Sequence, residues 1–181
     1  MPNTGENELI TVDVFKKIGL DKGMSVGDLG CGNLGYFAVR AAKIVGKGGA
    51  VYAVDILKSA LQAVENIARQ ESLENLKTVW SNLELVGATR IPESNLDVAF
   101  IHNVLFQSDR DGEVLKETFR LLKSGGKLMV IDWKKTDSPF GPPLADKISA
   151  DEVKSHAQNA GFKLAEEFAA GPYHYGLIFV K

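Results

Sequence analysis

The chain has 181 residues, of which 45% are hydrophobic and 24% charged, the composition of a globular domain rather than of a disordered or fibrous chain. Its 21 Lys and Arg against 23 Asp and Glu give a net charge of -2, so it lacks the basic excess of a general nucleic-acid binder. The single cysteine excludes an internal disulfide and a cysteine-rich zinc or iron–sulfur site. The opening MPNTGENELI has no features of a signal peptide, and no apolar run approaches the ~20 residues of a membrane span. We therefore expect a cytoplasmic protein.

The amino-terminal part of the chain is expected to be loose and then helical. Residues 1–8 are polar and predict a flexible N-terminus, and residues 9–181 are expected to form a single domain. The first helix is expected to end at Gly19, and its apolar face is formed by Ile10, Val14 and Ile18.

Strand-like and helix-like segments then alternate. Five strands are predicted, at Met24–Leu29, Ala50–Asp55, Leu76–Trp80, Leu96–Ile101 and Lys127–Asp132. Apolar residues at helical spacing follow three of these strands and predict a helix after each. After the first strand they are Leu34, Ala38, Ala41 and Val45. After the second they are Leu61, Val64, Ile67 and Ala68, and after the fourth they are Leu115, Phe119 and Leu122. The last of these helices is expected to run from Asp109 to Gly125–Gly126. Strands separated by helices predict a parallel sheet with helices on both faces.

The carboxyl-terminal part departs from this alternation. Ser149 and Glu152 have the spacing of a capping box, and they begin a helix that Gly161 ends. Two further strands, Phe162–Phe168 and Tyr173–Val180, are joined by a turn that is too short for a crossover. They must form an antiparallel hairpin, so one of the seven strands is reversed.

The strongest functional signal is the glycine pattern in SVGDLGCGNLG. Gly30, Gly32 and Gly35 form GxGxxG directly after a strand and before a helix. Glycine lets the backbone turn tightly and approach a ligand, and the helix amino terminus supplies unpaired N–H donors. A tight strand-to-helix turn without a ligand would carry the same pattern, but its position favours a nucleotide-like cofactor.

Two carboxylates distinguish between cofactors. Asp28 would repel a pyrophosphate and attract a ligand that bears an ammonium group, and it could also tie down the turn through backbone bonds. Asp55 ends the second strand, about 20 residues beyond the glycines, where a carboxylate can accept hydrogen bonds from ribose hydroxyls. A solvated Asp at a strand end is the alternative.

Together these features resemble the class I S-adenosylmethionine-dependent methyltransferases. The resemblance runs from about Leu20 to Lys181, and LKETFRLLKSGGKLMVIDW is similar to the branch of the ubiquinone/menaquinone-type C-methyltransferases. It implies a three-layer αβα Rossmann-like sandwich and S-adenosylmethionine as cofactor, with S-adenosylhomocysteine as product. The cofactor-binding positions that it implies are Asp28, Gly30, Cys31, Gly32, Asp55, Ile56, Asn82 and Leu83. Asn33 and Leu34 stand where the family often has a shorter glycine spacing.

The acceptor end of the site is expected in the loops after the fourth and fifth strands. His102 is the candidate general base, and a histidine that merely caps the strand end is the alternative. Four aromatic residues are candidates for an apolar substrate pocket or for packing, namely Tyr36, Phe106, Trp133 and Phe140. His156 and His174 have no neighbours at ligand spacing in the sequence, so we expect no metal site.

Three functions remain open at this point. The first is methyl transfer to a small-molecule acceptor, without nucleic acid and without membrane insertion. The second is a non-catalytic domain that binds S-adenosylmethionine or a partner protein, because little of the chain is left to form a lid over the acceptor. The candidates for a lid are the amino-terminal helix and the loop Thr136–Lys147, and the second subunit of a homodimer could complete the pocket. The third, a nicotinamide-dependent oxidoreductase, is disfavoured by Asp28 and by the terminal hairpin.

Overall fold

The computed structural model describes residues 13–181. The expected flexible N-terminus at residues 1–8 and the apolar position Ile10 lie outside the described residues. The first described helix, α1 (Val14–Ile18), begins at the N-cap Asp13. It ends at Gly19 in the left-handed conformation, and the predicted end of the helix is therefore confirmed.

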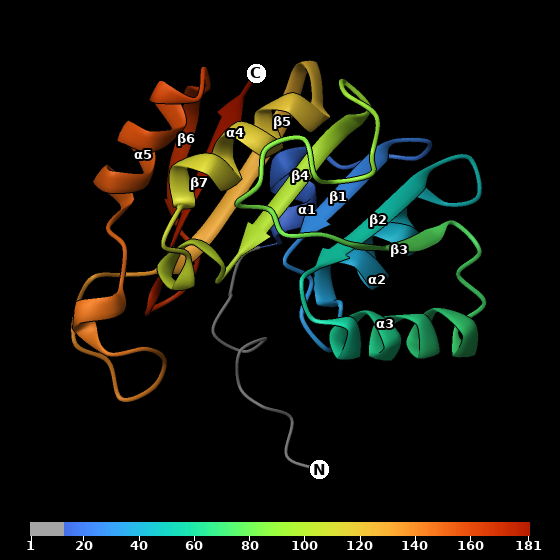
Figure 1. Cartoon of the computed structure of the whole chain (residues 1–181), viewed down its shortest axis with the longest axis horizontal. Helices are drawn as coiled ribbons and strands as arrows, with labels where there is room; N and C mark the ends of the chain where they lie inside the picture. Colours follow the sequence, from blue (N-terminus) through green and yellow to red (C-terminus); the bar gives the residue numbers. More distant parts are fainter. Residues whose placement is uncertain (1–12) are drawn as a thin grey trace.

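Seven strands form one sheet in the order β3-β2-β1-β4-β5-β7-β6 (Figure 1). The strands are β1 (Ser25–Leu29), β2 (Ala50–Asp55), β3 (Leu76–Trp80), β4 (Leu96–His102), β5 (Leu122–Trp133), β6 (Lys163–Ala169) and β7 (His174–Val180). The first five pair in parallel, and β7 runs antiparallel to both β5 and β6. The predicted mostly parallel sheet with one reversed strand is therefore confirmed.

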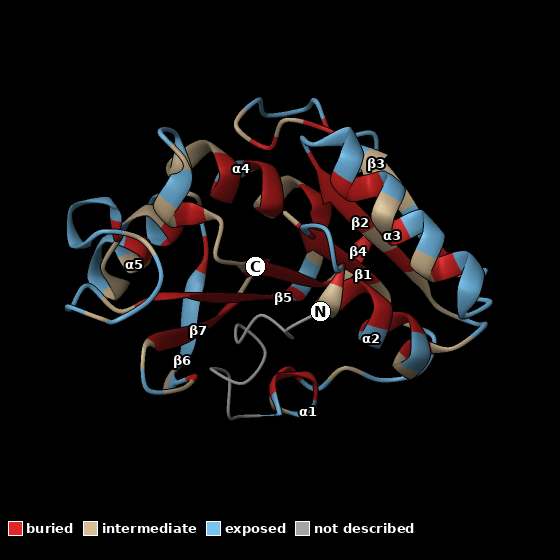
Figure 2. Cartoon of the chain, turned by 90° about the horizontal axis from the view of Figure 1, so that it is seen from below, coloured by how far each residue is buried: buried red, intermediate tan, exposed pale blue. Residues whose placement is uncertain are grey.

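Helices cover both faces of this sheet. They are α1, α2 (Tyr36–Val45), α3 (Lys58–Gln70), α4 (Asp111–Leu121) and α5 (Ala150–Asn159), with the short 3-10 turns η1 (Leu105–Gln107) and η2 (Leu144–Asp146). Val98 and Phe100 of β4 pack in one core cluster with α1, α2 and α3, whereas Ala99 and Ile101 pack in the other with α4 and α5. This alternation is the period of a strand buried on both faces, and Figure 2 shows the sheet buried between its helices. In the described part of the chain, no helix has both the length and the apolar character that crossing a membrane requires.

Two local predictions were wrong, each for a tertiary reason. The helix expected to continue to Gly125 ends at Leu121, because Leu122 is extended and pairs with Leu96 as the first residue of β5. Leu34 was expected on the buried face of a helix, but its side chain is 54% exposed. The helix begins only after Gly35, whose φ of 50° is left-handed and breaks the helical run.

Candidate functional site

The turn between β1 and α2 is shaped by three glycines with positive φ. A Cβ on Gly30 would lie 2.3 Å from Cγ2 of Val104, and one on Gly35 would lie 2.8 Å from Cγ2 of Val64. A Cβ on Gly32 would meet nothing within 4 Å. Gly30 and Gly35 therefore allow close packing of the turn, whereas Gly32 leaves open space beside the backbone.

Asp28 joins β1 to the following helix. Its side chain is 2% exposed, and Oδ2 accepts the backbone N–H of Ala38 at 2.9 Å. Burial raises the pKa of this carboxyl to about 7, the Ala38 bond opposes that rise, and the nearby charge of Asp55 adds to it. Asp28 thus anchors the turn, which is the second of the roles considered from the sequence, and it also lines the cavity described below.

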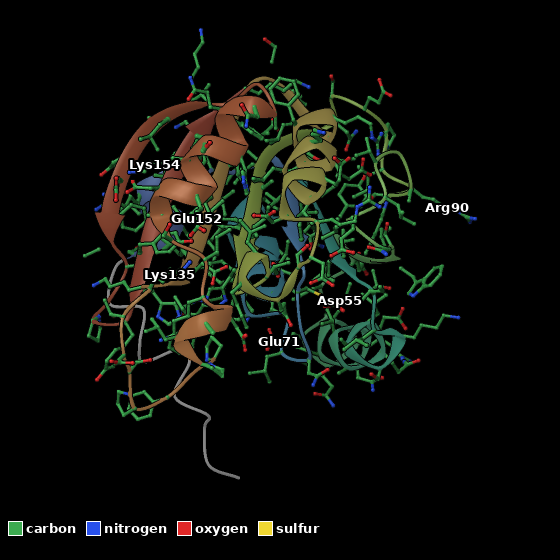
Figure 3. The ribbon with its side chains drawn as sticks, turned by 60° about the vertical axis from the view of Figure 1, so that its left-hand side comes forward. Asp55, Glu71, Arg90, Lys135, Glu152 and Lys154 are labelled. Carbon is green, nitrogen blue, oxygen red and sulfur yellow. The ribbon has the colours of Figure 1, made fainter. Side chains whose placement is uncertain are left out.

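Asp55 lies at the carboxyl end of β2, close to the start of α3 (Figure 3). Oδ2 accepts the N–H of Gly32 and Oδ1 accepts the N–H of Leu57, both at 2.9 Å. The carboxylate therefore joins the glycine turn after β1 to the turn after β2. Each carboxylate oxygen keeps a second lone-pair site, so a ligand hydroxyl can still donate to it.

His102 ends β4, with its ring centroid 5.0 Å from that of Phe37. Burial, and to a lesser degree His174, lowers the pKa of His102 to about 3, so the ring is neutral at pH 7. Asn103 follows with a φ of 53°, which is uncommon outside glycine. Neither polar atom of its buried side-chain amide has a hydrogen-bond partner among the described residues. Strained backbone and unpaired polar groups of this kind gather at functional sites.

These residues surround one cavity of about 840 Å³, within the range of small-molecule and cofactor sites. All nine candidate site residues line it, and they are Asp28, Gly30, Cys31, Gly32, Asp55, Ile56, Asn82, Leu83 and His102. It lies where β1, β2 and β4 end, which is the usual ligand crevice of a parallel α/β sheet. The parallel order of the strands alone brings these distant residues together.

Other lining residues were not among the predicted site residues. Asn103 and Gln107 follow β4, while Gly141 and Pro142 come from the loop after β5. The left-handed backbone of Asn103 could not be predicted from a single sequence, because residues other than glycine rarely adopt it. The position of the loop that carries Gly141 and Pro142 depends on how the loop packs. Among the candidate aromatic residues, Tyr36, Phe106 and Trp133 line the cavity. Phe140 does not, because it is 55% exposed and packs on Tyr173.

The sheet order, the glycine turn and the crevice at the strand ends define a Rossmann-like αβα protein with a site for a nucleoside-type cofactor. The model of a methyltransferase domain family matches residues 20–171, and the chain therefore belongs to that family. The predicted class, that of the S-adenosylmethionine-dependent methyltransferases, is confirmed.

Particular relatives agree with this assignment. A crystal structure of a SAM dependent methyltransferase from Aquifex aeolicus superposes with a TM-score of 0.89 at 26% identity, over 99% of this chain and 94% of that one. The demethylmenaquinone methyltransferase of Geobacillus sp. (strain WCH70) is 29% identical over 66% of this chain and 50% of its own length. The ubiquinone/menaquinone biosynthesis C-methyltransferase UbiE of Hahella chejuensis is 32% identical over 74% of this chain and 56% of its own length. The chain thus spans about half the length of the curated relatives it matches.

Proposed function

We propose that this chain transfers the methyl group of S-adenosylmethionine to a small, uncharged acceptor bound in the cavity beside the cofactor. One observation carries the proposal. The acidic residues suited to the cofactor and the aromatic residues suited to an acceptor line the same cavity of about 840 Å³. A catalytic methyltransferase needs both ligands in one enclosed space, whereas a cofactor-binding module needs only the first.

The cofactor half has donors and acceptors that fit S-adenosylmethionine. Asp28 would receive the ammonium group of the methionine part, and the free lone pairs of Asp55 would accept the ribose hydroxyls. Ile56 and Leu83 supply apolar surface for the adenine, next to the amide of Asn82. The open space at Gly32 lets the ligand approach the backbone. A pyrophosphate would instead meet two carboxylates, so the nicotinamide alternative is not favoured.

The acceptor half is largely apolar, and no Lys or Arg is among the described residues that line the cavity. Tyr36, Phe106 and Trp133 form its wall, together with the uncharged amides of Asn103 and Gln107. Among the described residues that line the cavity, the acidic ones are Asp28, Asp55 and Glu84. An anionic acceptor would be repelled and would find no charged partner, so an uncharged and planar molecule fits best. A quinone-type ring, the acceptor to which the relatives' names refer, has this character.

The chemistry that the residues must perform is modest. When bound, the cofactor supplies a methyl group already activated by a positively charged sulfur. The protein would hold the acceptor in line with that group, and the apolar side chains of Phe106 and Trp133 would exclude water from it. His102 is neutral at pH 7, so it can accept a hydrogen bond, and then the proton, from the acceptor group that is methylated.

Ligand binding tests the proposal directly. A ligand at 100 times its dissociation constant adds about 2.7 kcal/mol of stability, which raises the melting temperature of a domain of this size by about 5–10 °C. We expect this shift with S-adenosylmethionine and S-adenosylhomocysteine and none with NAD. A shift with NAD alone would refute the assignment. Binding without methyl transfer to any compound of a quinone and phenol panel would favour the non-catalytic alternative.

The assembly and location of the protein also belong to this proposal. A homodimer would let a second subunit cover the cavity near residues 136–147, and light scattering of the purified chain measures it. A cytoplasmic location and the lack of a nucleic-acid partner are the predictions that the single cysteine and the net charge of -2 support.

A further inference from the structure

A second histidine lies directly behind the wall of the acceptor half. His174 begins β7, is 0% exposed and is not among the residues that line the cavity. Its ring centroid is 4.1 Å from that of Trp133 and 6.1 Å from that of His102. Both of those neighbours line the cavity, so His174 contacts the site only through other side chains.

Three ring nitrogens of these two histidines are buried without a hydrogen-bond partner among the described residues. They are Nε2 of His102 and both ring nitrogens of His174. Nδ1 of His102 is not one of these buried unpaired atoms, it makes no hydrogen bond within residues 13–181, and His102 lines the cavity. Buried polar atoms are rarely left unpaired, so three of them in two neighbouring rings call for a physical explanation.

We propose that His174 is a positioning residue that holds His102 in the tautomer protonated on Nε2, so that Nδ1 presents its lone pair to the acceptor. This inference rests on the proposed function. The rings make no direct hydrogen bond, and one bridging water molecule between them would accept from Nε2–H of His102 and donate to a nitrogen of His174. A neutral imidazole has one donor and one acceptor, so fixing the donor at Nε2 fixes the acceptor at Nδ1.

The charges around the pair keep both rings neutral. Burial first, and then the ammonium groups of Lys134 and Lys147, together lower the pKa of His174 to about 4. Lys147 lies 5.7 Å from the Trp133 ring and donates to the carbonyl of Thr136, so it is held near the pair. A protonated His102 would have no lone pair to offer the acceptor. Burial and the nearby positive charges keep both rings unprotonated before the reaction.

The proton then has a defined destination. As the nucleophilic atom of the acceptor bonds to the methyl carbon, the carbon–sulfur bond breaks and its electron pair stays on sulfur. The hydrogen of the acceptor group leaves as a proton to Nδ1 of His102, and the positive charge passes from the sulfonium to the imidazolium. The low pKa of His102 returns this proton to solvent once product leaves.

Histidine NMR tests the tautomer without any acceptor. The chain has three histidines, so labelling with ¹⁵N-histidine gives three ring systems, and His156→Gln identifies the one in α5. In the wild type we expect His102 in the Nε2–H form. His174→Phe keeps an aromatic ring but removes the nitrogens, and we expect the preference for this tautomer to fall by up to about tenfold. His174→Gln retains a polar partner and is expected to restore it.

Each outcome decides the proposal. An Nδ1–H tautomer of His102 in the wild type overturns it, as does an unchanged tautomer in a folded His174→Phe protein. If that variant does not fold, the wild type and His174→Gln decide, and loss of the Nε2–H form in His174→Gln overturns it. Calorimetry with S-adenosylhomocysteine runs in parallel. We expect unchanged affinity in His174→Phe, and failure of the wild type to bind would refute the proposed function without affecting the tautomer result.

Discussion

The most informative stability perturbation is at Glu117 of α4, a carboxylate with 0% exposure. It accepts the backbone N–H groups of Gly87 at 2.7 Å and Thr89 at 3.1 Å, and it receives Nε and Nη2 of Arg120 at 2.9 and 2.7 Å. The hydroxyl of Thr89 in turn lies 3.0 Å from that of Ser81, which lines the cavity. Glu117 therefore ties the segment after β3 to α4.

The magnitude follows from the surroundings of Glu117. Burial alone would raise its pKa, but hydrogen bonds from Arg120, Gly87 and Thr89 outweigh burial and lower it from 4.5 to about 2. That difference corresponds to about 3 kcal/mol of stability at pH 7. Glu117→Ala also leaves the Arg120 guanidinium without its partner, so we expect the free energy of unfolding to fall by about 3–5 kcal/mol. Glu117→Gln, which keeps one acceptor oxygen, should lose about half as much.

The sign of the pH dependence is fixed by the same pKa. Because the carboxyl of Glu117 has a lower pKa in the folded than in the unfolded state, the unfolded state binds more protons between these values. The advantage of the wild type over Glu117→Gln is therefore complete above pH 4.5 and shrinks as the pH falls toward about 2. Urea denaturation followed by circular dichroism, repeated across this range, measures it.

A matched control lies on the same helix. Glu113 forms an i,i+3 ion pair with Lys116 at 2.8 Å at the surface, and Glu113→Ala should leave the urea midpoint unchanged. The reasoning is refuted if Glu117→Gln is as stable as the wild type at pH 7. It is also refuted if the difference between the two proteins does not change between pH 4.5 and 2.

Three further predictions concern the site and its supports. Asp55→Ala should weaken S-adenosylhomocysteine binding by about 1.5–3 kcal/mol in calorimetry, and unchanged affinity would remove Asp55 from the site. Gly35→Ala should lower the free energy of unfolding in a urea titration by about 1–2 kcal/mol or more, because φ is 50° and the new Cβ meets Val64. Its control is Gly112→Ala in α4, where the new Cβ has open space, and this variant should be neutral or slightly stabilising in the same titration. Ser149→Ala removes the capping box with Glu152 and should cost about 1 kcal/mol, and an equal loss in Ser155→Ala would contradict that explanation.

The sequence predicted one of these stabilising contacts, because the spacing of Ser149 and Glu152 is that of a capping box at the start of α5. The structure confirms both of its hydrogen bonds, from each backbone N–H to the side chain of the other residue. Figure 3 shows Glu152 also pointing toward Lys135, to which it is bonded at 3.2 Å, so the capping residue holds the loop after β5 as well. The spacing of two residues identifies a cap, because the bonds are local. The link to Lys135 joins residues 17 apart, and only the packed loop decides it.

The sequence by itself determined the first and last residues of β2 and β3. Turn-forming residues flank each apolar segment, and pairing with neighbouring strands does not extend either strand beyond them. The sequence also determined that Asp28, Asp55 and His102 would meet, since the carboxyl ends of parallel strands share one edge of the sheet. Only the tertiary structure decided that Leu122 begins a strand, through its pairing with Leu96. The tertiary structure alone brought His174 beside His102, because the reversed β7 pairs with β5 and only β5 separates it from β4. This proximity depends on the order of the strands in the sheet and not on any spacing along the chain.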